Sequence, residues 1–341
     1  MQTENQSKAY SRPLVGLLVL VTGSLLLVGS IALAISVGAA NLDLAAVWRA
    51  VLHYDATREA DQIVMSLRLP RELGAAIVGA AFAVSGAIMQ GLTRNPLAEP
   101  GLLGLNAGAS FALACIYAFL PSVSYLSILF LSFLGAGLGA GIVLGLGTLK
   151  EGGMTPLRIT LAGAAVSTLF TALAEGIAIY YKVSQDLSFW IAGGVSGVNW
   201  NQLKIIFPII LLGIVLSFLL SRELTVLSFG EEVAKGLGQR TFLVKIILMV
   251  IVFILAGAAV SIVGAVAFVG LIIPHIVRFL VGTDYRWVLP CSAIFGSLFM
   301  VLADAIAKTV NAPFETPIGA VVAIAGIPFF FYLVRRGERR F

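Results

Sequence analysis

The sequence predicts an all-α polytopic membrane protein with about ten transmembrane helices. Of its 341 residues, 59% are hydrophobic and only 11% are charged, whereas a soluble domain carries about 25% charged residues. Folded in water, this chain would have too little polar surface to cover itself. Its apolar runs show no alternating strand pattern, and only helices or closed barrels satisfy their backbone groups in lipid. A bilayer crossed by helices is therefore the expected setting.

Each helix is predicted from one apolar run, because about 20 apolar residues cross the hydrocarbon layer. The predicted spans are 14–36, 73–92, 101–120, 124–148, 157–180, 203–221, 243–263, 265–281, 287–307 and 317–334. The first run exceeds the roughly 7–15 apolar residues of a secretory signal, so we expect an uncleaved span. The seventh and eighth spans are nearly fused, with the break at Gly264. Together the spans predict one membrane domain over 1–341, with an N-terminal tail over about 1–13.

The basic residues predict the orientation of the chain. With the N-terminus inside, fifteen Lys and Arg residues fall on inner segments and seven on outer ones. The positive-inside rule then places both termini in the cytoplasm, as an even number of spans requires. This distribution also accounts for the net charge of +5 without a nucleic-acid partner.

Glycines in the fourth span predict close helix contacts. Gly135 and Gly139 are four residues apart, as are Gly141 and Gly145. In lipid, glycine at this spacing lets two backbones approach. The string superficially resembles a nucleotide-binding loop, but no strand precedes it and no acidic residue follows at the required distance.

The sequence lacks the motifs of an enzyme or an autonomous pump. It has no G-x-x-x-x-G-K-[ST] phosphate loop, and no His, Cys and carboxylate residues at metal-ligand spacing. His53 and His275 fall on opposite sides of the membrane in the predicted topology. We therefore expect no catalytic residue, no metal site and no cofactor in this chain, and any transport would draw its energy from a partner.

The inner loop at about 222–240 is the candidate surface for such a partner. Glu231 and Glu232 come early in it, Lys235 follows, and Gly236 and Gly238 can end a helix. Acidic residues at the start of a helix and a basic residue at its end stabilise the helix dipole. The loop is thus interpreted as a short docking helix, with a solvated loop as the alternative.

Several motifs run through the chain in order. They are LRLPRELGAAIVGAAFAVSGAIMQGLTRNPLAEPGLLGLNAGA (67–109), LAGAAVS (161–167), FWIAGGVSGVNW (189–200), FGEEVAKGLG (229–238), AFVGLIIPHIVRFLVGTDYR (267–286), ADAIAK (303–308) and PFETPIGAVVAIAGIPFFFYL (313–333). Together they closely resemble the permease subunits of bacterial ABC importers for iron-siderophore complexes, haem and cobalamin, the FecCD-type or type II importers. The resemblance covers nearly the whole chain.

The resemblance implies an assembly and a cargo. Members of this family have ten helices per subunit and work as two permease subunits, which can be identical or different, in the bacterial cytoplasmic membrane. Two cytoplasmic ATPase subunits bind ATP and Mg, and an outer substrate-binding protein or lipoprotein delivers the cargo. For this chain the implied cargo is a ferric siderophore, with haem or cobalamin as the alternative. An ion-coupled carrier working alone is a third hypothesis, against which the scarcity of mid-membrane charges argues.

The resemblance also implies roles for individual residues. The implied residues for coupling to the ATPase are Gly230, Glu231, Ala234 and Gly238, and Glu231 could pair with an ATPase arginine. Docking of the outer binding protein is carried by Arg68, Arg71 and Lys308, although an arginine at this boundary can also simply snorkel.

The cytoplasmic gate is implied at two places. Asn95 and Leu97 lie in the turn after the second span, where Pro96 and Pro100 interrupt the helix; a rigid turn without gating is the alternative. The second gate element, before the fifth span, would involve Thr155 and Pro156, where this sequence departs from the small hydroxyl residues usual in the family.

The transport pathway is implied along the fifth span. Its candidate lining residues are Ser167, Thr168, Thr171 and Glu175, which share roughly one helix face. A polar stripe suits a hydrophilic chelate that must pass without tight binding. Hydrogen bonds to neighbouring helices are the alternative role.

Overall fold

The computed structural model describes residues 11–38, 42–148, 156–312 and 314–337, and these form helices joined by turns. Seven apolar helices are long enough to cross a membrane: Pro13–Ser36, Glu59–Thr93, Tyr125–Leu146, Leu157–Tyr180, Trp200–Leu219, Thr241–Val263 and Tyr285–Thr309. Three shorter apolar helices are Leu105–Phe119, Val269–Val281 and Ile318–Leu333. Each predicted span overlaps one of these helices, and the helix of the second span begins well before residue 73, at Glu59. Membrane crossing by the three shorter ones, and thus the count of ten spans, stays a prediction.

The helices of the first half begin with α1 (Pro13–Ser36), and the short α2 (Leu44–Leu52) and α3 (Glu59–Ile63) follow it. One continuous run then contains α3, a π-helical turn η1 (Val64–Arg68) and α4 (Leu69–Thr93). After it come a 3₁₀ turn η2 (Pro100–Leu103), α5 (Leu105–Phe119), α6 (Tyr125–Thr148) and α7 (Pro156–Tyr180).

The second half contains α8 (Ser184–Ala192), α9 (Trp200–Leu219), α10 (Ser221–Ser228) and α11 (Glu231–Gly236). The last four helices are α12 (Thr241–Val263), α13 (Val269–Val281), α14 (Tyr285–Thr309) and α15 (Ile318–Gly337). The predicted break between the seventh and eighth spans lies where expected, because α12 ends at Val263 and Gly264 follows with a φ of +74°.

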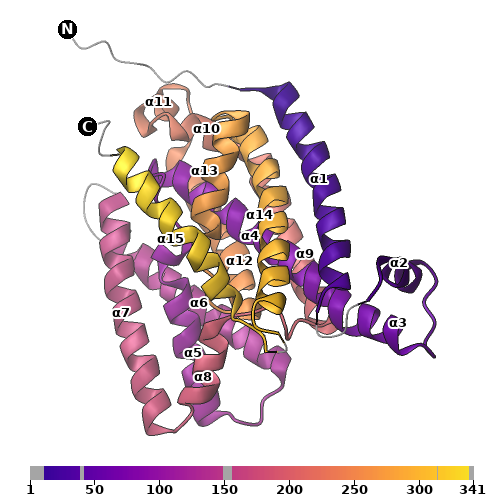
Figure 1. Ribbon diagram of the computed structural model, residues 1–341. Helices are drawn as coiled ribbons and strands as arrows, with labels where there is room; N and C mark the ends of the chain where they lie inside the picture. The colour runs from indigo at the N-terminus through magenta and orange to yellow at the C-terminus, as the bar shows by residue number, and fades with distance from the viewer. Residues whose placement is uncertain (1–10, 39–41, 149–155, 313, 338–341) are drawn as a thin grey trace.

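The central helix of the bundle is α4 (Figure 1), which packs against α14, α12, α13 and α9. In its apolar 18-residue stretch, 89% of the residues are buried, because Ala, Gly and Val occupy most positions on every side of the helix. By contrast, α1 packs mainly along α14 and leaves most of its leucines exposed. A helix that is apolar on all sides is buried in protein or faces lipid, and α4 and α1 are the two cases.

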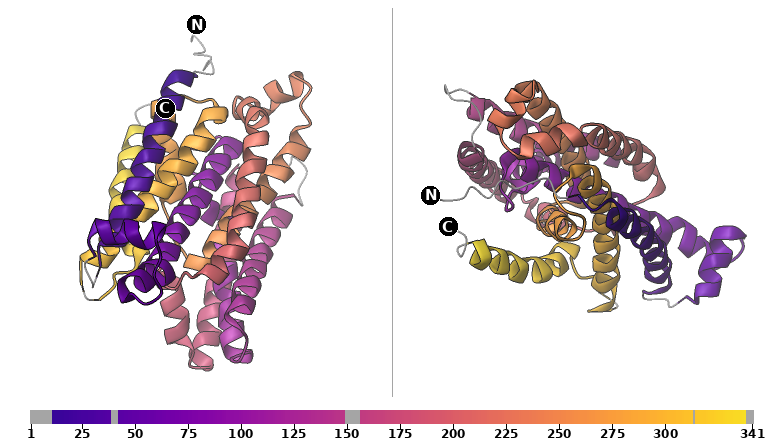
Figure 2. Two further views of the ribbon diagram at one scale, coloured as in Figure 1. Left: turned by 90° about the vertical axis from the view of Figure 1, so that its right-hand side faces the viewer. Right: turned by 90° about the horizontal axis from the view of Figure 1, so that it is seen from above.

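The two ends of the bundle carry different short elements. The start of α1, the end of α15 and the pair α10–α11 lie at one end, while α2, α3 and α8 lie toward the other (Figures 1 and 2). The N-terminus of α1 and the C-terminus of α15 thus lie at the same end of the bundle. We call the end with α11 the inner end and the opposite one the outer end, following the orientation that the basic residues predict.

Only the first glycine pair of α6 makes the close contact that the spacing predicts. A Cβ added to Gly135 would lie 2.4 Å from the Cβ of Ala112 and 2.5 Å from the carbonyl oxygen of Gly108, both in α5. Gly139 approaches the carbonyl oxygen of Gly104 in the same way, whereas a Cβ on Gly141 would meet no atom within 4 Å. The spacing is necessary for such a contact, but the helix face decides whether it forms.

We expect Gly135→Ala to destabilise the folded protein by about 1–3 kcal/mol, the usual cost of overpacking, because α5 and α6 must move apart. Gly141→Ala, in the same helix, is the matched control and should leave stability within about 0.5 kcal/mol of wild type. Thermal unfolding midpoints of the two purified variants in detergent would measure the difference. Equal midpoints would show that the α5–α6 contact does not depend on the absent side chain.

Candidate functional site

The inner loop folds into two helices with a sharp turn between them. Gly230 separates α10 from α11 with a φ of +131°, and Gly238 follows α11 with a φ of +80°. Both angles lie in the left-handed region that favours glycine. Ala234 has no exposed surface, so a larger side chain would push α11 off the bundle. Three of the four predicted coupling residues thus have a clear folding role, and the predicted single helix is in fact a pair.

The fourth predicted coupling residue, Glu231, is paired within the chain. Its carboxylate accepts hydrogen bonds from Lys245 of α12 and, at 3.1 Å, from Lys235 one turn along α11. These hydrogen bonds lower the pKa of Glu231 to about 2. The sequence-based idea of a pair with an ATPase arginine is therefore not needed to explain an acidic residue here, because Lys245 already joins this carboxylate to α12.

The side of α11 that faces away from the bundle is partly apolar. Val233 is 50% exposed and Leu237 is 70% exposed, and four-residue spacing puts them on one face. Gly236 and Glu232 are exposed beside them. This apolar face and the 39% exposed side chain of Glu231 are both open to solvent on α11.

The turn after α4 is held by its own polar groups. Arg94 ends α4 in the left-handed conformation, with a φ of +51°. The side chain of Asn95 accepts a hydrogen bond from the backbone N–H of Leu97 at 3.0 Å, and the Asn95 carbonyl accepts one from the N–H of Ala98 at 3.1 Å. The helix therefore ends before Pro96, and the predicted gate residue Asn95 shapes a rigid turn.

The two inner-end segments contact each other. A Cβ on Gly230 would lie 3.5 Å from Nη1 of Arg94. Arg94, at the start of the predicted gate turn (residues 94–98), therefore touches Gly230, the hinge between α10 and α11. Leu97, the second predicted gate residue, packs against a small apolar cluster of Leu271 and Ile272 of α13 and Leu333 of α15. The predicted gate turn and the hinge between α10 and α11 are thus in direct contact.

The turn continues into η2, which packs against the fifth predicted span. A Cβ on Gly163 of α7 would lie 1.8 Å from the carbonyl oxygen of Leu102, so only glycine allows this approach. Of the second predicted gate element, Thr155 lies outside the described residues, and Pro156 is the first residue of α7.

At the outer end, Arg71 lies between two carboxylates. Its Nε and Nη2 donate to Asp304 of α14 at 2.9–3.2 Å, and its Nη1 donates to Glu315 at 2.5 Å. The Arg71 side chain is only 12% exposed. Fork-like pairing of this kind is the strong form of an ion pair.

Lys308 completes the same network. It donates to Glu72, to Asp304 at 3.1 Å and to the carbonyl oxygen of Ala34 at 3.0 Å, and its side chain is 8% exposed. Arg68 donates to the carbonyl oxygen of Ile35 at 2.5 Å. The residues predicted to dock an acidic partner are therefore engaged inside the chain, and Arg71 and Lys308 would reach such a partner only if this network opened.

A comparison with protein-family models matches residues 25–336 to the FecCD transport family. The chain belongs to the FecCD transport family. Relatives cover nearly all of it: it is 53% identical over 330 residues to the iron(3+)-hydroxamate import system permease protein FhuB of Bacillus subtilis, spanning 97% of this chain and 86% of that protein. The hemin transport system permease protein HmuU of Yersinia pestis is 37% identical, over 90% and 93% of the two chains.

The fold has a counterpart among solved structures. An inward-facing conformation of an ABC transporter, described as of metal-chelate type, superposes with a TM-score of 0.81 at 30% identity, covering 93% of this chain and 99% of that one. The resemblance read from the motifs is thus confirmed at the level of family and fold.

In this FecCD chain, α7 leaves one side uncovered. Its packed side consists of small or apolar residues such as Val166, Phe170 and Ala174, and Phe170 stacks on Phe111 of α5 with ring centroids 5.1 Å apart. Among the predicted pathway residues, Thr168, Thr171 and Glu175 are exposed and Ser167 is half-buried. Their shared face is as predicted, whereas pathway lining stays a prediction.

Sequence reasoning missed Glu72 and Glu315 of the outer network and one residue of the turn after α4. Glu99 accepts a hydrogen bond at 3.3 Å from the backbone N–H of Phe268, which precedes α13 with a φ of +70°. A glutamate between Ala98 and Pro100, in a turn otherwise poor in charge, was the available signal. Glu99 therefore ties the gate turn to the start of α13.

We expect Glu99→Leu to destabilise the protein by about 1–3 kcal/mol, since the Phe268 N–H would lose its acceptor. Glu99→Gln retains an oxygen acceptor and should stay close to wild type. Thermal midpoints of the two purified variants measure the contrast. If glutamine and leucine lowered the midpoint equally, the negative charge of Glu99, and not this hydrogen bond, would matter.

Proposed function

We propose that this chain is the transmembrane permease subunit of an ATP-driven importer that passes a ferric siderophore, most simply a ferric hydroxamate, into the cytoplasm. The observation that carries the proposal is the 53% identity, over 97% of the chain, to a permease named for iron(3+)-hydroxamate import. Haem and cobalamin are the cargoes named for relatives at 37% identity. The higher identity favours the hydroxamate.

The proposed assembly follows from the faces that the bundle leaves open. One of two ATPase subunits, which bind ATP and Mg, would receive Val233 of α11 and Leu237, the residue after this helix, at the inner end. A second permease subunit would cover the exposed side of α7, and the cargo would pass between the two subunits along Thr168, Thr171 and Glu175. An outer binding protein would deliver the chelate at the opposite end, in the bacterial cytoplasmic membrane.

The proposed coupling is mechanical. Displacement of α11 would pull on α12 through the Glu231–Lys245 pair. It would reach α14 through α10, where the Thr225 hydroxyl accepts a hydrogen bond from the Tyr285 N–H at 3.0 Å. At Gly230 it would press on Arg94 and hence on the gate turn. The energy of ATP hydrolysis would thus reach the gate through packed contacts between rigid helices.

The test is uptake by cells lacking only this chain. Radiolabelled iron is supplied as hydroxamate, catecholate and citrate chelates and as haem, and labelled cobalamin is assayed in parallel. Loss of ferric hydroxamate uptake, restored by the wild-type gene, is the expected result. Selective loss of haem or cobalamin uptake would assign that cargo instead, and unchanged uptake of all five would refute the proposed cargo classes.

A further inference from the structure

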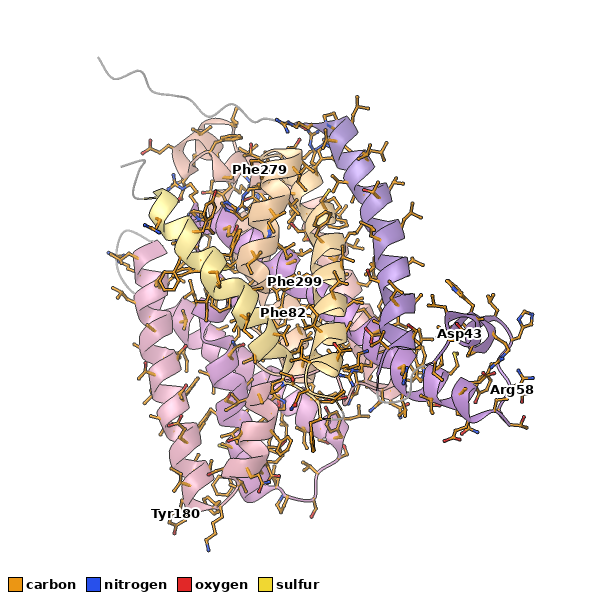
Figure 3. The ribbon with its side chains drawn as sticks, viewed as in Figure 1. Asp43, Arg58, Phe82, Tyr180, Phe279 and Phe299 are labelled. Atoms are coloured by element: carbon orange, nitrogen blue, oxygen red, sulfur yellow. The ribbon has the colours of Figure 1, made fainter. Side chains whose placement is uncertain are left out.

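A short helical hairpin projects sideways from the outer end of the bundle. It consists of α2 and α3, and it extends past the outer end of α1, away from the remaining helices (Figures 1 and 2). Figure 3 labels Asp43 before α2 and Arg58 at the far tip. Nothing in the proposed transport mechanism uses this element.

The hairpin is firmly built. Val47 and Ala50 of α2 are buried with Ile35 of α1 and Val64 of η1 in a small apolar cluster of their own. Asp61 of α3, which has no exposed surface, accepts the Asp55 N–H at 3.2 Å and pairs with Arg49 of α2 at 3.4 Å. Two helices fixed by a core and a buried carboxylate hold a defined surface outward.

One exposed side of α2 is apolar. Leu44, Trp48, Val51 and Leu52 are 40%, 47%, 39% and 68% exposed. Their spacing of i, i+4, i+7 and i+8 puts them on one side of α2, next to the buried side and away from Arg49. An apolar strip of this kind on a well-packed helix marks an interaction site.

Lipid fits this strip better than a protein partner does. The strip lies on a helix that packs against α1. The leucines of α1, such as Leu26 and Leu33, are more than half exposed, and α1 is one of the helices able to cross the membrane. The hairpin lies beside α1 and not over the end of the bundle, where a delivered chelate must enter (Figure 1). Trp48 and the half-exposed Tyr54 are the residue types enriched at the membrane–water boundary.

We propose that α2 lies in the outer headgroup layer, with Leu44, Trp48, Val51 and Leu52 inserted toward the acyl chains. An amphipathic helix binds a bilayer in this way when its apolar side is buried in the boundary region. The hairpin then acts as an interfacial anchor, which sets how deeply α1 and the adjoining α4 lie in the bilayer and how they tilt. This inference goes beyond the proposed function and holds whatever the cargo is.

The test uses the full chain in lipid nanodiscs. Subtracting the fluorescence of Trp48→Phe from that of wild type isolates the Trp48 emission. Replacing the lipid by one brominated near the top of its acyl chains should remove most of this emission, whereas aqueous acrylamide should remove little. Emission that resists brominated lipid but falls with acrylamide would overturn the proposal.

A second variant guards against a local effect of the substitution. Leu52→Trp, made in the Trp48→Phe background, places the indole elsewhere on the same side of α2 and should be quenched by brominated lipid as well. Thr57→Trp in that background, at the polar tip, should respond to acrylamide instead. If purified outer binding protein shielded Trp48 from acrylamide and brominated lipid had no effect, the strip would belong to that protein and not to lipid.

Discussion

Reversing either charge of the Glu231–Lys245 pair is expected to lower transport strongly, and reversing both is expected to restore most of it. Glu231→Lys would bring a third cation beside Lys235 and Lys245, and Lys245→Glu would set two carboxylates together. In either case α11 would lose its attachment to α12. In the double variant, the pair re-forms with its polarity exchanged.

The measurement is uptake of labelled ferric hydroxamate by cells whose own copy is deleted, with membrane levels of each variant determined alongside. We expect each single variant to lower uptake at least about tenfold, which corresponds to about 1.4 kcal/mol, and the double variant to recover most of it. Lys235→Ala is the control, since that pair is exposed and within one helix and should matter little. A double variant as inactive as Glu231→Lys would instead favour a contact between Glu231 and an ATPase arginine.

The outcome should not depend on pH in the range where cells grow. The folded pKa of Glu231, about 2, lies below its ordinary value of 4.5. Its ion pairs therefore contribute in full above about pH 4.5 and are lost only as the pH falls toward 2.

The sequence was sufficient for the ten apolar helices that the structure describes, because each apolar run is a local property of the chain, but it did not predict α2, α3 or α8. It also predicted a helix end at Gly236 and Gly238, where α11 ends, but not the left-handed φ of Gly230 between α10 and α11. It could not decide which glycine pair of α6 meets a neighbour, since Gly135 and Gly141 differ only in the direction that they face. Nor could it reveal that Arg71 pairs with Asp304, because these two residues are 233 positions apart in the chain.

The pairing of Arg71 with Asp304 changes the interpretation of the basic residues at the outer end. Read alone, Arg68, Arg71 and Lys308 are three cations near a membrane boundary, and such cations suit an acidic partner. Read with Glu72, Asp304 and Glu315 beside them, Arg71 and Lys308 belong to an ion-pair network that joins α4 to α14, while Arg68 donates to the carbonyl oxygen of Ile35. A docking surface and an internal ion-pair network lead to different expected effects of replacing Lys308. Loss of a docking cation would weaken partner binding, whereas loss of a network cation would lower the stability of the fold.

We expect Lys308→Met to destabilise the protein by about 3–5 kcal/mol, because it removes one partner of a buried ion pair. Glu72 is fully buried, and in the described part of the chain its Oε2 already lacks a hydrogen-bond partner. Without Lys308, a charged carboxylate would be left in the apolar interior. The thermal unfolding midpoint and the amount of folded protein in membranes should both fall sharply.

The double variant Glu72→Gln with Lys308→Met should recover much of the loss, because replacing both partners of a buried pair costs far less than breaking it. Arg58→Met is the control, since it breaks an exposed pair with Asp55 and should change stability by at most about 1 kcal/mol. The contrary result is equally informative. If Lys308→Met were as stable as wild type and weakened only the binding of the outer binding protein, Lys308 would be the docking cation that the sequence predicts, and the network would have to open during delivery of the chelate.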